Sequence, residues 1–275
     1  MDGRIKLGFF AGALALFSGC VTSSSQNTLP NNSSPNPNDK GGAVSFKTDN
    51  EPWKTFPKGK HDASAATEIA FGKMKEIEAD SPQYKAHPEA QAKLRDDARK
   101  AYQKAVQTDP NNIEAQRHLG RIYVKMGDID RAQDVYRKAL AKHPKEGSLW
   151  YDFGLCHTRR AATTKDFTES MRCFNKALEL EPENRDYLKM LGMTLAWVGQ
   201  LDAALSRLSL AQGAPMAHYN IARILEQKDQ VELAKQHLRL ALRGNAQLED
   251  AREMLARLEN PGSTRAMDNV SQNRQ

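Results

Sequence analysis

The sequence lacks the short motifs that mark the common classes of enzyme. The patterns GxSxG, GxGxxG, HExxH and the lysine loop that cradles nucleotide phosphates do not occur in its 275 residues. The seven histidines are scattered along the chain, and no two are spaced i, i+4 as ligands on one helix face would be. We therefore expect no catalytic residues, no cofactor and no metal centre, and a protein that is not an enzyme.

Cysteine is also scarce, with three in the chain. Cys156 and Cys173 fall on the two helices of one expected hairpin, where they could form a disulfide or serve as two small buried apolar residues. Cys156 is followed directly by His157, but neighbours on a helix point about 100° apart. With no third ligand at hand, metal binding or thiol catalysis is not expected there.

No hydrophobic run is long enough to span a bilayer, which takes about 20 residues. The longest uncharged, mostly apolar run is the twelve residues Leu7–Ser18, which follow Arg4 and Lys6. This order is typical of a secretory signal. The closing letters FSGC resemble the bacterial lipobox, although Phe17 stands where that family usually has Leu.

The lipobox resemblance implies that residues 1–19 are removed and that Cys20 is acylated and becomes the mature N-terminus. Its lipid would anchor the protein stably to a membrane. The alternative is an ordinary signal peptide in which Cys20 is incidental. We expect an exported, lipid-anchored protein of the cell envelope, and Val21 in place of Asp favours an outer membrane, facing the periplasm, if the organism is Gram-negative.

Residues 20–60 are rich in Ser, Asn and Pro and predict a disordered tether. Trp53 and Phe56 interrupt its polarity, and could either dock onto the first helix or form a short partner-binding motif. Residues 261–275 predict a disordered tail.

Between these segments, residues 110–144 contain two amphipathic stretches bounded by prolines 34 residues apart. Small and large apolar residues fall between the prolines in a fixed order: Leu119, Gly120, Tyr123, Gly127, Ala132, Tyr136 and Ala139. This order and spacing resemble the tetratricopeptide repeat (TPR), a helix–turn–helix unit of 34 residues, and the protein resembles the bacterial TPR lipoproteins.

Further copies of the pattern follow, so the best repeats are 111–144, 145–182, 183–213 and 214–245. The resemblance implies an all-α, right-handed superhelical TPR solenoid of about four to five helical hairpins plus a C-terminal capping helix, over residues 61–260. We expect helices at 62–80, 88–108, 112–125, 129–142 and 246–259, the first capped by Asp62 or Ser64. The first helix of the repeat before residue 110 lacks the Leu-Gly pair. In the repeat 111–144, Ala132 is expected to face Gly120 across the hairpin.

In this architecture the first helix of each hairpin lines a concave groove. The positions that core packing leaves over on these helices predict a peptide-binding surface: Arg117, Arg121, Lys125, Tyr151, Leu155, Arg159, Lys189, Met193, Trp197, Tyr219 and Arg223. Such a surface suits an extended or helical peptide with acidic groups, and a solvated, incidentally basic face is the alternative. TPR domains that grip C-terminal carboxylates use a Lys/Asn clamp, which Arg121 and Leu155 do not provide.

The net charge of +6 is a weak indication of anionic partners, and an export signal argues against nucleic acid. We expect a non-enzymatic scaffold that helps assemble or regulate a cell-envelope complex through a protein or peptide partner. The alternatives are a passive structural envelope lipoprotein, or an accessory binding subunit of a cell-wall or secretion enzyme. The sequence does not identify the partner or the oligomeric state.

Overall fold

The structure is a computed structural model that describes residues 64–160 and 164–260. Several sequence-based predictions lie outside these residues: the signal 1–19, the lipidation site Cys20, the tether 20–60 with Trp53 and Phe56, and the tail 261–275. Among the described residues, no helix is both long and apolar enough to cross a membrane.

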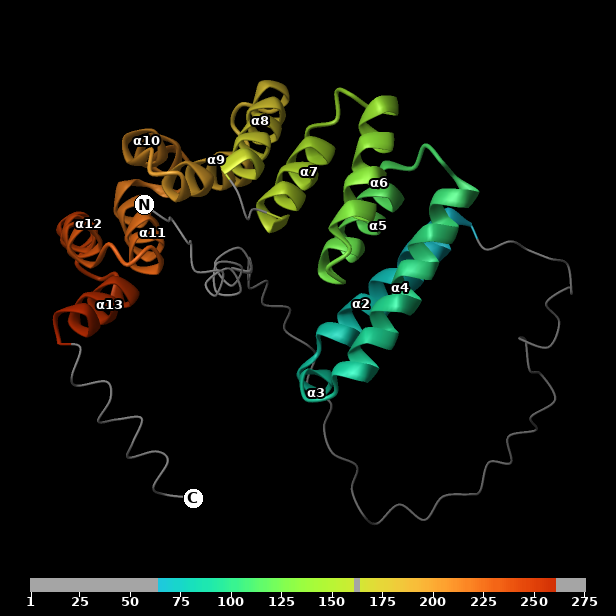
Figure 1. Ribbon diagram of the computed structural model, residues 1–275, viewed down its shortest axis with the longest axis horizontal. Coiled ribbons are helices and arrows are strands. Elements are labelled where there is room, and N and C mark those ends of the chain that lie inside the picture. The colour runs from blue at the N-terminus through green and yellow to red at the C-terminus, as the bar shows by residue number, and fades with distance from the viewer. Residues whose placement is uncertain (1–63, 161–163, 261–275) are drawn as a thin grey trace, which may run out of the picture. The chain divides into compact units, whose positions relative to one another are not determined.

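Every regular element in the described ranges is an α-helix, as the sequence predicts (Figure 1). In chain order the helices are α2 (Ala65–Asp80), α3 (Pro82–Lys85), α4 (Pro88–Thr108), α5 (Ile113–Lys125), α6 (Ile129–Lys142), α7 (Gly147–Arg160), α8 (Thr164–Leu180), α9 (Arg185–Trp197), α10 (Leu201–Gln212), α11 (Ala214–Gln227), α12 (Val231–Gly244) and α13 (Glu249–Glu259).

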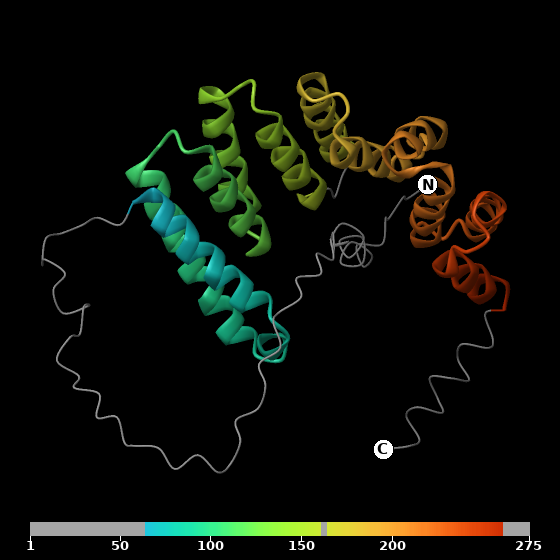
Figure 2. The same ribbon diagram turned by 180° about the vertical axis from the view of Figure 1, so that it is seen from behind.

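These helices form consecutive antiparallel hairpins. The closest packing is within the pairs α2/α4, α5/α6, α7/α8, α9/α10 and α11/α12, whose members lie side by side in both views (Figures 1 and 2). Each hairpin also packs on the next, and α13 packs on α12 as the last helix. First helices of successive hairpins touch as well, at α2–α5, α5–α7 and α9–α11. The predicted solenoid of about five hairpins with a closing helix is confirmed.

Side-chain caps and proline set where several helices begin. Asn112 accepts a hydrogen bond from the Ala115 backbone N–H at 2.9 Å and so caps α5. Asn184 and Asp128 cap α9 and α6 in the same way, and Ser64 is the residue that caps α2. Pro88 occupies the first turn of α4, where its missing N–H leaves no hydrogen bond unmade.

Within each hairpin, a small residue on the first helix lets a large side chain of the second helix approach the backbone. A Cβ added at Gly120 would collide with the Tyr136 ring, and one at Gly154 would collide with Phe174. The fully buried Tyr136 ring is thus the group nearest to Gly120, and that Ala132 also faces this glycine stays a prediction. Tyr136 also reaches the next hairpin, where its ring centroid lies 6.0 Å from that of Phe153.

The first hairpin is more regular than the sequence suggests. Gly72 on α2 packs against the buried ring of Tyr102 on α4, in the same relation as Gly120 to Tyr136. The first repeat lacks the Leu-Gly pair, as predicted, but Phe71 and Gly72 take its place, so the repeat keeps its glycine. Thirty residues separate Gly72 from Tyr102, against sixteen between Gly120 and Tyr136, because α2 and α4 are longer on both sides of the turn and the turn itself contains α3.

Cys156 and Cys173 are both free thiols, and both are completely buried. Burial raises the pKa of each thiol to about 12, so both are neutral at physiological pH. The two cysteines thus serve as small apolar core residues in this structure, the second of the two roles expected for them.

Candidate functional site

The candidate site is the surface that the first helices of the hairpins share. We define the first-helix row from the repeat glycine of each first helix. The row contains the residues three before, one after and five after that glycine. In α11, Ala222 takes the place of the glycine. The eleven residues predicted from the sequence all occupy such positions. Gly72 adds three members on α2: Ile69, which is buried, and Lys73 and Ile77, which stand where Arg121 and Lys125 stand relative to Gly120.

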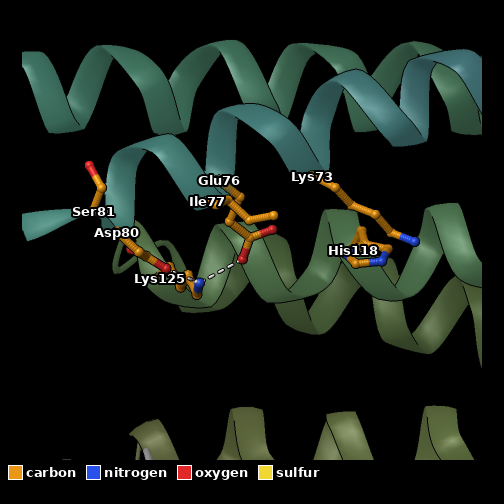
Figure 3. Close-up of a pocket in the computed structure, with 7 residues that line it drawn as sticks. All are labelled: Lys73, Glu76, Ile77, Asp80, Ser81, His118 and Lys125. Atoms are coloured by element: carbon orange, nitrogen blue, oxygen red, sulfur yellow. Dashed lines mark hydrogen bonds and ion pairs between the residues drawn. The ribbon is translucent and has the colours of Figure 1, made fainter. Parts of the chain in front are cut away.

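A cavity of about 580 Å³ opens on this row between α2 and α5 (Figure 3). Seven residues line it: Lys73, Glu76, Ile77, Asp80, Ser81, His118 and Lys125. Ile77 is 74% exposed, and two further apolar side chains of α2, Phe71 and Met74, are also exposed. The cavity is therefore lined mainly by charged and polar side chains with one exposed apolar side chain, Ile77, while Phe71 and Met74 are exposed elsewhere on α2.

The cations of the cavity are held by carboxylates of the same chain. The Nζ of Lys125 lies 2.6 Å from a Glu76 oxygen and 2.7 Å from an Asp80 oxygen, as the dashed lines of Figure 3 mark. Lys73 pairs with Glu114 on α5. Burial alone would raise the pKa of Asp80, but hydrogen bonds from Lys125 and Arg95 outweigh it and hold that pKa below its usual 3.8. These pairs link α2 to α5.

Arg117 and Arg121 share one buried carboxylate on the neighbouring hairpin. The Nε of Arg117 donates to one oxygen of Asp152 at 2.8 Å, and Arg121 donates to the other through Nη2 at 2.8 Å and Nε at 3.1 Å. The Asp152 side chain is 0% exposed, while the two arginine side chains are 27% and 40% exposed. The sequence-based description of these arginines as lying on a face left free by packing is wrong, because both are engaged between α5 and α7.

Further along the row the predicted residues are less uniform. Tyr151 stacks on Tyr187 of α9, with centroids 4.9 Å apart, and burial raises the pKa of Tyr151 to about 12. Leu155, Trp197 and Tyr219 are half-buried. Met193 is 1% exposed and belongs to the core, so its prediction as an outward-facing residue is wrong.

Three cations of the row have no carboxylate partner within the described residues: Arg159, Lys189 and Arg223. Arg159 is exposed at the end of α7, and Lys189 is half-buried on α9. The guanidinium of Arg223 lies over the Tyr219 ring, 5.6 Å from its centroid. These side chains, rather than Arg117, Arg121 and Lys125, are free to pair with an acidic ligand.

The sequence reasoning missed two arrangements that the fold creates. The first is the role of Asp152, whose position two residues before Gly154 was the available signal. The second is a histidine pair on the last hairpin: the Nδ1 atoms of His218 on α11 and His237 on α12 lie 3.0 Å apart. The two histidines are 19 residues apart, so they fall on the two helices of one hairpin, and this spacing was the available signal. No group of three or more His, Cys, Asp and Glu in the described ranges is placed to hold a metal.

Comparisons with known proteins agree with the repeat seen in the geometry. Residues 89–153 match one model of the tetratricopeptide repeat, and residues 161–184 and 217–247 match another. The chain carries tetratricopeptide repeats. TPR proteins are generally non-enzymatic scaffolds that bind protein or peptide partners, so the coarse functional class is protein–protein interaction.

Two curated proteins align with parts of the chain. The general transcriptional corepressor ssn6 of Schizosaccharomyces pombe is 32% identical over 88 residues, which cover 31% of this chain and 8% of that protein. The photosystem I assembly protein Ycf3 of Prochlorococcus marinus is 32% identical over 85 residues, which cover 29% of this chain and 49% of that protein. The chain thus spans less than half the length of these relatives.

Among solved structures, a thermophilic TPR protein of Thermus thermophilus is similar to this chain at 16% identity and a TM-score of 0.49. The alignment covers 71% of this chain and 98% of that one.

Proposed function

We propose that this protein is a non-enzymatic scaffold of the cell envelope, anchored by a lipid on Cys20, that binds a partner peptide along the first-helix row. The observation that carries the binding proposal is a set of row cations that pair with no carboxylate of the described residues, interspersed with aromatic side chains: Arg159, Lys189 and Arg223. Arginine and lysine pair with carboxylates, and aromatic rings supply apolar contact area. The expected partner is an extended or helical segment with acidic groups.

The ion pairs decide which variants can test this surface. Reversing the charge at Arg117 or Arg121 would leave the buried Asp152 beside a second carboxylate, so loss of binding could reflect unfolding. Lys189→Glu combined with Arg223→Glu avoids this problem, because neither residue holds a carboxylate in the described part of the chain. Arg207→Glu on α10 is a matched control, since Arg207 is exposed and lies on a second helix.

The test is crosslinked affinity purification from intact cells with the tagged chain. We expect the double variant to lose most of the proteins captured by the parent chain, and Arg207→Glu to retain them. Equal capture by the double variant, with unchanged circular dichroism, would exclude the row as the binding surface.

The anchor is tested separately. Cells grown with labelled palmitate should label the parent chain and not Cys20→Ala, and the variant should leave the membrane fraction. An unlabelled parent chain would exclude the lipid anchor while leaving the binding surface untouched, because the two features lie in different parts of the sequence.

A further inference from the structure

The histidine pair on the last hairpin is the most specific polar arrangement outside the first-helix row. His218 and His237 come from two facing helices, and their ring centroids lie 5.1 Å apart with the planes at 52°. The Nδ1 atoms, 3.0 Å apart, are each other's hydrogen-bond partners. Since a ring nitrogen either donates or accepts, one of the two Nδ1 atoms carries a proton and the other does not.

Both imidazoles are neutral near pH 7. Burial lowers the pKa of His218, and burial together with the neighbouring His218 lowers the pKa of His237. No carboxylate of the described residues shifts either pKa, although α9, α10 and α13 pack against this hairpin. Two uncharged imidazoles whose Nδ1 atoms point at one another are a chelating pair, because metal ions bind the neutral ring.

The spacing fits such an ion. Two nitrogens that each lie about 2.0–2.1 Å from one tetrahedral zinc ion are about 3.4 Å apart. The pair would have to open by about 0.4 Å, and each ring would have to turn by about 35° so that both Nδ1 lone pairs point at one ion beside the line between them. We propose that His218 and His237 form a two-imidazole site for a borderline transition-metal ion such as Zn²⁺, Cu²⁺ or Ni²⁺.

The chemistry of the pair sets the class of ion. Imidazole nitrogen suits zinc, copper and nickel, whereas calcium and magnesium require oxygen ligands. The ion takes the place of the shared proton: the histidine that carried it on Nδ1 carries it on Nε2 instead, so no proton is released overall. Water completes the coordination. The bound ion joins α11 to α12 by two coordinate bonds.

The test uses the full-length chain with Cys20→Ser, so that this thiol does not compete for the metal. Calorimetric titration with ZnCl₂ should show one site per chain. His218→Gln and His237→Gln should each lower the affinity at least about tenfold, because a chelate needs both nitrogens. His87→Gln, which changes an exposed histidine before α4, should bind as the parent does.

A spectroscopic measurement separates ligation from a structural effect. Cu²⁺ bound to the parent chain should show electron paramagnetic resonance splittings from two nitrogens, and each single variant should lose one of them. Circular dichroism verifies that the variants stay folded. Unchanged zinc affinity in both single variants, or no stoichiometric binding by the parent chain, would overturn the proposal.

Discussion

The position two residues before the repeat glycine differs between the N-terminal and the C-terminal hairpins. In α7 it holds Asp152, whereas in α9 and α11 it holds Met190 and Asn220. All three residues are buried, at 1%, 5% and 6% exposure. In α7, α9 and α11 the fold therefore buries this position whatever its chemistry, whereas His118 on α5 is half-buried and Ala70 on α2 is exposed. Where the position is buried, the neighbouring repeat has to match it.

The residues that face this buried position lie on the first helix of the preceding hairpin. They are the residues three before and one after the glycine of that helix. For Asp152 they are Arg117 and Arg121, which pair with it directly. The same two positions before Met190 hold Tyr151 and Leu155, which are apolar or aromatic. The contact between α5 and α7, which we call the polar junction, is thus made by charged side chains, and that between α7 and α9, the apolar junction, by apolar and aromatic ones. The row cations beyond α7 have no carboxylate partner among the described residues. We infer that row charges near α5 serve packing and those near α9 and α11 serve binding.

The largest expected effect comes from converting the polar junction into the apolar one. Arg117→Tyr with Arg121→Leu leaves Asp152 buried without a partner and should cost about 3–5 kcal/mol of unfolding free energy. Adding Asp152→Met should recover most of that loss, since it recreates the combination found before Met190. Chemical denaturation measures both steps, with Lys138→Ala, a 75% exposed side chain on α6, as a control expected to change little.

If Asp152→Met fails to rescue the double variant, the two junctions are not interchangeable. The residues at equivalent positions relative to the repeat glycine would then not be sufficient to explain why one junction is polar and the other apolar.

The glycine position offers a second contrast, of intermediate size. Gly120→Ala should destabilise the protein by about 1–2 kcal/mol, because over-packing against the rigid Tyr136 ring outweighs the better helix propensity of alanine. Ala222→Gly at the equivalent position of α11 should also destabilise, by about 1–2 kcal/mol, through the lower helix propensity of glycine and the loss of a buried methyl group. Thermal unfolding of both variants tests this, and a stabilised Gly120→Ala would show that Tyr136 can move aside.

Acid should loosen the last hairpin through its histidines. The folded-state pKa values of His218 and His237 lie below the usual 6.5, so the unfolded chain binds protons more readily. Their contribution to stability is present above pH 6.5 and is lost as the pH falls towards the folded-state values. The test is hydrogen exchange in α11 and α12 with a chelator present, expressed as protection factors that correct for the slower intrinsic exchange at low pH. From pH 7.5 to pH 5 these protection factors should fall more in the parent chain than in a His218→Gln/His237→Gln chain.

The smallest effect is expected at the turn between α11 and α12. Asp229 has a φ of 61°, in the place where Gly127 and Gly199 have 81° and 87° in other hairpins. Asp229→Gly should relieve the left-handed strain and stabilise the protein by about 0.5 kcal/mol, after the entropy cost of glycine. Denaturation midpoints test the sign, and destabilisation would mean that the Asp229 side chain supports the turn.

Much of the fold could be predicted from the sequence because its signals are local. Proline and asparagine mark where α4, α5 and α9 begin, and the small–large spacing within residues 110–144 predicts α5 and α6 within one residue. Gly72 was missed because the longer α2 and α4, together with the turn that contains α3, change its spacing to Tyr102. The position of Gly72 in the repeat becomes clear only from its packing against Tyr102 in the folded hairpin.

The candidate site was less predictable, since it depends on contacts between repeats. Helix periodicity places Arg117 and Arg121 on one stripe, but only the stacking of α5 on α7 brings Asp152 to them. The burial of Met193 likewise depends on how neighbouring hairpins pack around α9. The histidine pair needed two helices to be placed face to face.

The binding role of the C-terminal part of the row is tested most directly by site-specific photocrosslinking in intact cells. Two variants are made: in one a photoreactive residue replaces Lys189, and in the other it replaces Arg207. The account predicts a discrete partner adduct at position 189 and none at position 207. Equal adducts at both positions, or an adduct at 207 alone, would contradict it.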